Sequence, residues 1–237
     1  MKIVAAKKLL KANDQLAAEN RAKLDAAGVL GVNLVGSPGC GKTTLLEGLF
    51  AVLKGASGAL RPASGAMRPA SGALRPAVIE GDIAGSIDAQ RIAALNVPVV
   101  QINTDGACHL DAAMIAAATA DLDYQAIDLL VIENVGNLVC TAGFDLGEHV
   151  RIAVLSVTEG DDKIVKYPAI FQGSDLVVIT KSDLAPLTNF RAERVVDDVR
   201  RLNPEIPVLQ VSALKGDGIP ELAQWLVDQR RVNDQGE

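Results

Sequence analysis

The chain has 237 residues and a net charge of −6, and 49% of its residues are hydrophobic. This length and composition are typical of a packed α/β unit. The acidic balance argues against nucleic-acid partners, which are bound through a basic surface. The sequence contains no recognisable signal peptide and no apolar run of the roughly 18–20 residues that span a bilayer. Because three cysteines are too few for a disulfide framework, we expect a cytoplasmic protein without membrane partners.

The N-terminal segment predicts a surface helix. Residues 3–27 are dominated by Ala, Leu, Lys, Glu and Gln, which favour helices, and Gly28 is suited to end one. Its apolar residues are sparse: Val4, Leu9, Leu10, Leu16 and Leu24. We expect residues 1–28 to pack as a helix on one domain that covers residues 29–237.

A repeat follows the first helix of that domain. Residues 56–76 are three copies of a seven-residue unit, ASGALRP, ASGAMRP and ASGALRP. A coiled coil is ruled out because the proline in each copy would break the helix. We interpret residues 55–76 as a low-complexity surface loop. A basic arm for an acidic partner is the alternative, since the copies carry three arginines and no acid.

Short apolar runs alternate with helical segments along the rest of the chain. We expect strands at 29–35, 77–80, 97–103, 129–133, 152–157, 176–180 and 208–211. We expect helices at 42–53, 86–95, 109–118, 190–202 and 219–230. Continuously apolar strands that alternate with helices indicate a mainly parallel sheet covered on both faces.

The segment between the first strand and the next helix matches the phosphate-binding pattern G-x-x-x-x-G-K-[ST] without a mismatch. Its backbone N–H groups and the helix N-terminus attract phosphates, Lys42 reaches the β- and γ-phosphates, and the Thr43 hydroxyl suits Mg²⁺. We interpret Cys40 as a small side chain of the loop, because a metal on its thiol would lie against the phosphates. The predicted nucleotide-binding residues are Gly36, Ser37, Gly39, Cys40, Gly41, Lys42, Thr43 and Thr44. The predicted fold class is a three-layer α/β/α P-loop NTPase.

Two later segments favour guanine over adenine. Thr180-Lys181-Ser182-Asp183 resembles the [NT]KxD element of GTPases, in which the acid accepts two guanine N–H groups and the lysine stem lies on the base. Ser212 and Ala213 resemble the second base-contacting loop. Asn is commoner than Thr at position 180, and this departure puts the affinity for guanine in doubt. The alternative role for Asp183 is that of a helix N-cap.

Two acids end predicted strands at the same edge of the sheet. We assign Asp82 and Glu133 to Mg²⁺ and to positioning of the attacking water, with Lys42 completing the catalytic set. The Gly136 N–H is suited to sense the γ-phosphate. The alternatives are a solvated loop acid and a capped strand end.

The chain has two histidines and three cysteines, yet two of these five residues are adjacent. Cys108 and His109 precede a predicted helix, and Cys140 lies in the loop after Glu133. Thiolate and imidazole favour Zn²⁺ or Ni²⁺ over Mg²⁺. One chain supplies three ligands, so a second chain related by a two-fold axis would complete a shared site. A buried cysteine beside a surface histidine is the alternative, and spacing alone does not decide.

Taken together, these motifs resemble the HypB family of hydrogenase nickel-incorporation GTPases, of the SIMIBI class. The stretches that carry the resemblance are GSPGCGKTTLLE, EGDIAGSIDAQRI, TDGACHLDAAMI, DLLVIENVGNLVC, VTEGDDKIVKYP, TKSDL and VSALKGDGI. The resemblance implies a GTPase that forms a homodimer with GTP bound and delivers nickel during [NiFe]-hydrogenase maturation. Its implied partners are a HypA-type accessory protein and the hydrogenase large subunit. It also implies that Cys108, His109 and Cys140 form the metal site at the dimer interface.

Some relatives in this family carry an N-terminal CxxCGC motif or a His-rich stretch, but residues 1–30 here contain neither Cys nor His. We therefore expect no separate nickel store in this chain. One alternative function is that of a urease-type or cobalamin-pathway GTPase of the same class. The urease type is expected to show Cys-Pro-His, whereas Cys108 and His109 are adjacent. The other alternative is a metal-binding module with vestigial GTPase activity.

Overall fold

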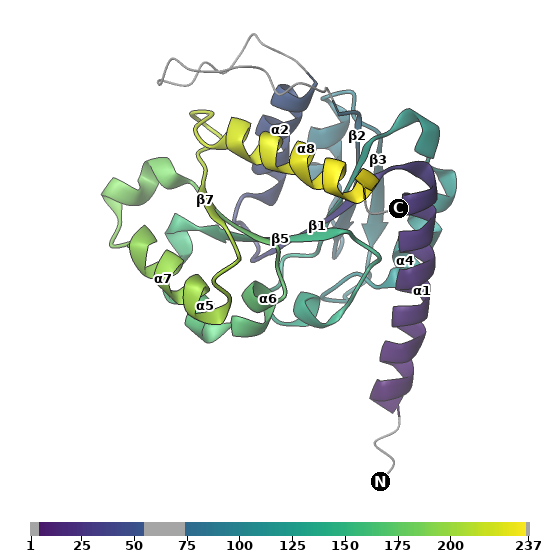
Figure 1. Ribbon diagram of the computed structural model, residues 1–237, viewed down its shortest axis with the longest axis horizontal. Coiled ribbons are helices and arrows are strands. Elements are labelled where there is room, and N and C mark those ends of the chain that lie inside the picture. Colours follow the sequence, from purple (N-terminus) through teal and green to yellow (C-terminus); the bar gives the residue numbers. More distant parts are fainter. Residues whose placement is uncertain (1–4, 55–73, 236–237) are drawn as a thin grey trace.

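The computed structural model describes residues 5–54 and 74–235, in which seven strands form one sheet of order β3-β2-β4-β1-β5-β6-β7 (Figure 1). All the pairings between these strands are parallel, so the predicted α/β/α class is confirmed and the sheet of the described residues is wholly parallel. The strands are β1 (Leu30–Gly36), β2 (Pro76–Asp82), β3 (Val99–Asn103), β4 (Leu129–Glu133), β5 (Val150–Ser156), β6 (Leu176–Thr180) and β7 (Val208–Gln210).

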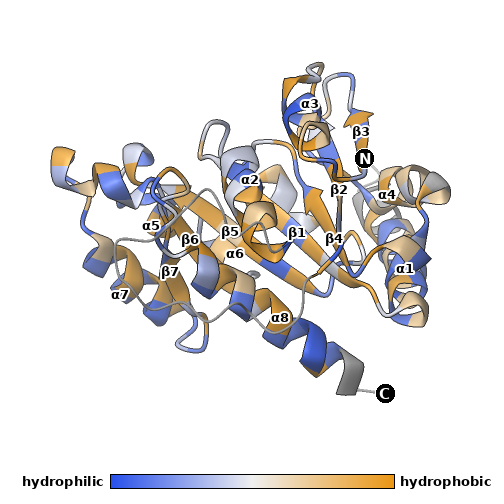
Figure 2. Ribbon diagram, turned by 90° about the horizontal axis from the view of Figure 1, so that it is seen from above, coloured by the Kyte–Doolittle hydropathy of each residue, from blue (hydrophilic) through white to orange (hydrophobic). Residues whose placement is uncertain are grey.

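Helices cover both faces of this sheet (Figure 1). They are α1 (Ala5–Ala27), α2 (Lys42–Leu53), α3 (Ile87–Ala93), α4 (Ala112–Ala118), α5 (Lys163–Lys166), α6 (Pro168–Gln172), α7 (Ala192–Leu202) and α8 (Ile219–Gln235). Alternate strand residues enter different cores, because successive side chains point to opposite faces. Val32 and Leu34 pack with α2 and α8, whereas Val35 packs with α6 and α7. Figure 2 shows the consequence, central strands that are hydrophobic almost throughout.

Helix α1 packs beside α4, and its contact face does not consist of apolar residues alone. Leu10 is 40% exposed. The buried stripe consists of Asn13, Ala17, Asn20 and Leu24, spaced as one face of a helix. The apolar positions alone could not define this face, because two of the buried positions are polar.

The end of the repeat belongs to the folded sheet, which corrects the predicted loop at 55–76. Leu74 is buried, and β2 already begins at Pro76. Between them Arg75 pairs with Asp128 through Nε and Oδ2 at 2.8 Å. The other repeat residues, up to position 73, lie outside the described residues.

Two short helices, α5 and α6, were not predicted, because four or five residues are too few to show a helical period. Helix α4 begins three residues later than expected. The Asp111 carboxylate accepts a hydrogen bond from Met114 N at 2.8 Å and caps the helix there. Cys108 and His109 therefore lie in the turn before α4. Among the described residues, no helix combines the length and the apolar character needed to cross a bilayer.

Candidate functional site

The phosphate-binding loop joins β1 to α2 as predicted. Helix α2 begins at Lys42 directly after Gly41, whose φ of 94° is accessible to glycine but strained for other residues. Lys42 is buried, and its Nζ donates to Ser37 O at 3.3 Å. A cavity of about 390 Å³ opens over the loop. Its lining includes Gly39, Gly41, Lys42, Thr43, Thr44, Asp82, Glu133, Gly136 and Lys181, but not Gly36, Ser37, Cys40, Asp183, Ser212 or Ala213.

Two buried carboxyl groups lie side by side in this cavity. Glu80 and Glu133 are partners in the β2–β4 register and are 3% and 4% exposed. The Thr43 hydroxyl donates to Glu133 Oε1 at 2.9 Å, while Oε2 of each glutamate has no hydrogen-bond partner within the described chain. Burial raises the pKa of Glu80 to about 8, and the charge of Glu133 adds to this. Burial also raises the pKa of Glu133 to about 7, against the opposing charge of Lys42. These hard oxygen donors fit Mg²⁺.

Asp82 and Gly136 reach the cavity from the ends of β2 and β4. The Asp82 carboxylate accepts hydrogen bonds from Ile83 N at 2.7 Å and Gly85 N at 2.8 Å, so it also shapes its own loop. A Cβ on Gly136 would lie 2.8 Å from the backbone N and Cα of Pro38. Only glycine lets the chain after β4 lie this close to the phosphate-binding loop.

The two predicted base-binding segments are joined by a hydrogen bond, because the Ser212 hydroxyl donates to Asp183 Oδ1 at 2.7 Å. Asp183 is not a helix N-cap, since the residue that precedes the 3-10 helix Ser182–Leu187 is Lys181 and no side chain caps it. Lys181 Nζ donates to Gly39 O at 2.8 Å. The segment therefore touches the phosphate-binding loop directly.

The contacts of Thr180 and Cys40 explain why these two residues fit at their positions beside the phosphate-binding loop. The Thr180 hydroxyl donates to Cys40 O at 2.6 Å, so it ties the base segment to the phosphate loop. The Cys40 side chain is fully buried in the core below, and burial raises the pKa of its thiol to about 11. This thiol is therefore a packing group and faces neither solvent nor a metal.

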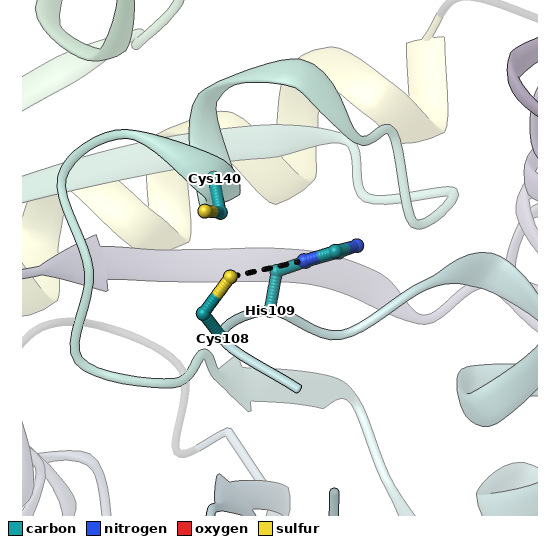
Figure 3. A group of neighbouring side chains, drawn as sticks. All are labelled: Cys108, His109 and Cys140. Carbon is teal, nitrogen blue, oxygen red and sulfur yellow. Dashed lines mark hydrogen bonds between the residues drawn. The ribbon is translucent and has the colours of Figure 1, made fainter. Parts of the chain in front are cut away.

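The three soft donors come together although Cys140 is distant in sequence from the other two (Figure 3). One ligand atom from each of Cys108, His109 and Cys140 lies within 4.8 Å of the others. Cys108 Sγ is 3.7 Å from His109 Nδ1, and the hydrogen bond with Cys108 raises the pKa of the Cys140 thiol. The His109 ring stacks on Phe144 with centroids 3.9 Å apart. All three donors are half-buried, so a metal ion can reach them.

The segment 133–141 connects the nucleotide cavity to these donors. Asn137 N donates to Gly36 O at 2.9 Å, and Asn137 Oδ1 accepts from Cys140 N at 2.9 Å. Asn134 Oδ1 accepts from Leu110 N at 3.2 Å, next to His109. One continuous segment thus contacts the phosphate-binding loop and both parts of the donor cluster.

Sequence reasoning assigned no role to Glu80, Asn134 or Asn137. A signal for Glu80 was present: it ends an apolar run as Glu133 does, and neighbouring parallel strands place such residues together. The asparagines gave no such signal, because their partners are backbone atoms of distant segments.

The sequence of this chain is similar to a family of nucleotide-binding proteins. Residues 30–210 match the family model described as "CobW/HypB/UreG, nucleotide-binding domain". The chain belongs to the CobW/HypB/UreG family. It is 48% identical to the hydrogenase maturation factor HypB of Azotobacter vinelandii over 222 residues, 94% of this chain and 68% of that protein. It is 40% identical to the probable hydrogenase maturation factor HypB of Methanocaldococcus jannaschii, over 93% of this chain and 92% of that one.

A solved structure gives the same assignment within the CobW/HypB/UreG family. The crystal structure of HypB from Helicobacter pylori in complex with nickel superposes with a TM-score of 0.83 at 36% identity. The match covers 94% of this chain and 96% of that one. The resemblance to HypB proteins inferred from the motifs is therefore confirmed.

Proposed function

We propose that this protein is a GTP-hydrolysing metallochaperone that binds nickel, or zinc, at Cys108, His109 and Cys140 and assists nickel insertion during [NiFe]-hydrogenase maturation. The HypB relatives named as hydrogenase maturation factors and the nickel complex of one of them support this role. The observation that carries it is the segment 133–141, which lines the nucleotide cavity from Glu133 to Gly136 and then reaches a soft donor, Cys140.

We assign GTP hydrolysis to the cavity over the phosphate-binding loop. Lys42 holds the β- and γ-phosphates, and Asp183, oriented by Ser212, accepts the guanine N–H groups. Thr43, Asp82 and Glu133 would hold Mg²⁺, which neutralises phosphate charge when bound. Glu133 and Gly136 position the attacking water and the γ-phosphate.

The coupling between nucleotide and metal follows from the contacts of the same segment. A γ-phosphate at Gly136 orders the chain after β4. Asn137 lies in this ordered segment and holds Cys140 there, because its Oδ1 accepts the hydrogen bond from Cys140 N. Hydrolysis removes the phosphate contact and changes the metal affinity. The coupling must be reciprocal, so metal alters nucleotide affinity by the same factor.

Three donors leave a tetrahedral ion one ligand short, so we propose that two GTP-bound chains form a homodimer that shares the metal. A HypA-type accessory protein and the hydrogenase large subunit are the proposed partners in delivery. The free thiols must remain reduced for this role, which suits the cytoplasm.

The deciding experiment measures bound Ni²⁺ per chain, together with molecular mass, in the presence of a non-hydrolysable GTP analogue or GDP. We expect a dimer with half an ion per chain in the GTP-analogue form and a different Ni²⁺ affinity in the GDP form. Cys140→Ala should lower Ni²⁺ affinity while it spares GTP binding. Equal Ni²⁺ affinity in the two nucleotide states would contradict the proposed switch.

A further inference from the structure

Helix α1 presents two buried asparagines where a helix that merely covers a domain would present apolar residues. Asn13 and Asn20 are 7% and 5% exposed and share one stripe with Ala17 and Leu24. Burial of a side-chain amide is unfavourable unless it is hydrogen-bonded. The partners of these two amides therefore indicate what they do.

Both asparagines bridge the same two segments of the chain. Asn13 Nδ2 donates to Asp145 O at 2.8 Å, and its Oδ1 accepts from Ala112 N at 2.9 Å. Asn20 Nδ2 donates to Ala112 O at 2.9 Å and to Leu146 O at 3.1 Å. The start of α4 and the loop before β5 are thus joined through α1.

The loop at 145–147 lies directly on α1. Arg21 Nε donates to Gly147 O at 3.0 Å. A Cβ on Gly147 would lie 2.6 Å from Ala17 O and 2.7 Å from Asn20 Cβ, so the backbone approaches the helix as closely as glycine permits. This contact leaves the loop little freedom to move relative to α1.

These two segments carry the donor cluster. Ala112 follows His109 closely in the turn that starts α4. Asp145 directly follows Phe144, whose ring stacks on His109, and the Phe144 residue belongs to the same loop as Cys140. The two asparagines therefore fix the separation of the segments immediately behind the donors.

We propose that α1 is the supporting shell of the metal site, with Asn13 and Asn20 as positioning residues that set the distance between Cys140 and the Cys108-His109 pair. This inference rests on the proposed metal role of the three donors. It accounts for the presence of an amide at position 20, which helix docking does not explain. Asn20 Oδ1 is buried and has no hydrogen-bond partner among the described residues, so an apolar side chain would suit docking better. Metal–ligand distances tolerate only about 0.2 Å of error, so the supporting bridges matter.

The test is a Ni²⁺ titration of the full chain, followed by the thiolate-to-nickel charge-transfer absorption and by competition with a chelator. In Asn13→Ala/Asn20→Ala we expect Ni²⁺ affinity to fall about 10-fold, with an altered absorption band. This is the lower end of the loss for side chains that hydrogen-bond directly to metal ligands, because these amides bond to the backbone of the segments that carry the donors. Affinity for a GTP analogue should be unchanged. Leu24→Ala is the matched control, since Leu24 packs on the same stripe but its side chain forms no hydrogen bond to either segment.

Asn20→Leu separates positioning from stability. It keeps apolar packing on the stripe but removes both N–H donors, so we expect the thermal midpoint to be retained while Ni²⁺ affinity falls. Wild-type Ni²⁺ affinity and spectrum in the folded double variant would overturn the inference. If Cys140→Ala binds Ni²⁺ as wild type does, the metal role of the donor cluster is itself wrong, and the positioning role falls with it.

Discussion

Lys42 is a buried cation whose Nζ donates to a carbonyl of its own loop, Ser37 O. That bond is replaceable by phosphate oxygens, which are stronger acceptors for an ammonium group. We expect Lys42→Ala to weaken GTP binding by about 100-fold or more, since hydrogen bonds to charged groups contribute about 1.5–3 kcal/mol each. Fluorescent GTP-analogue titration measures this. Lys54→Ala is the control, because Lys54 Nζ binds the carbonyls of Leu95 and Asn96 instead.

In the proposed function, base selection depends on the Asp183 carboxylate, which the Ser212 hydroxyl holds in place. Asp183→Asn replaces one acceptor oxygen by a donor, so we expect the ratio of GTP to ATP affinity to fall by about 10–100-fold. Ser212→Ala should reduce the same ratio less, because Asp183 keeps its charge but loses the 2.7 Å bond that orients it. Competition of each nucleotide against a fluorescent analogue gives the ratio. Unchanged selectivity in Asp183→Asn would contradict the base assignment.

The paired glutamates predict how stability depends on pH. The pKa values of Glu80 and Glu133 are about 8 and about 7 in the fold, against 4.5 without it. Between pH 4.5 and about pH 8 the native state binds more protons than the unfolded state, so the free energy of unfolding decreases as the pH rises through this range. Glu80→Gln removes one of these groups, and we expect it to be more stable than wild type above about pH 8. Thermal unfolding of the nucleotide-free protein from pH 5 to pH 9 tests this. Glu19→Gln, which removes an exposed carboxyl group of α1, is the matched control.

At this scale the sequence predicted the residues whose roles follow from a contiguous motif. The loop from Gly36 to Thr43 and the donors Cys108 and His109 are adjacent in sequence, so their proximity needed no fold. Glu80 and Asn134 acquire their positions only from strand register and from contacts with distant backbone. The polar stripe of α1 could not be predicted either, because the partners of Asn13 and Asn20 lie about a hundred residues away in the sequence.

At the scale of elements, the segment after β4 can lie against the phosphate-binding loop because Gly136 has no side chain. An alanine there would place its Cβ 2.8 Å from Pro38 backbone atoms, and the segment would have to move away. We expect Gly136→Ala to lower GTP turnover and to reduce the difference in Ni²⁺ affinity between GTP-analogue and GDP states. Steady-state phosphate release and Ni²⁺ titration measure the two effects.

Gly143→Ala is the matched control for that substitution. Gly143 lies further along the same connection, in the 3-10 helix Cys140–Gly143, and a Cβ there would meet no atom within 4 Å. Its turnover should equal that of wild type. Equal turnover in Gly136→Ala would show that the close approach to Pro38 is not needed for catalysis.

Long elements were predicted better than short ones for a physical reason. Helix α2 has the predicted bounds, since an apolar run, a glycine loop and a helical period mark both its ends. Helix α4 starts where the Asp111 side chain caps it, a local signal that the prediction did not use, and α5 and α6 are too short to show a helical period.

At the scale of the whole molecule, the order of the sheet explains how one edge acquires the entire site. β1 lies at the centre with β4 and β5 beside it, and all strands are parallel. The segments that follow β1, β2, β3, β4, β6 and β7 therefore lie at the carboxyl ends of the strands, where α/β proteins bind ligands. The repeat enters the sheet at the opposite end of β2, next to Asp128, which precedes β4.

We therefore expect the repeat to be separable from GTP turnover but not wholly from stability. Deletion of residues 56–69 removes two copies and spares the third, so we expect GTP turnover and thermal midpoint to match wild type. Deletion of 56–76 also removes Leu74, which is 5% exposed, and Arg75, whose guanidinium lowers the pKa of Asp128 to about 2. We expect that variant to unfold at lower temperature, as should Leu74→Ala, since large-to-small core substitutions cost about 2–5 kcal/mol. A loss of turnover in the shorter deletion, with the thermal midpoint retained, would assign the first two copies a role in the reaction itself.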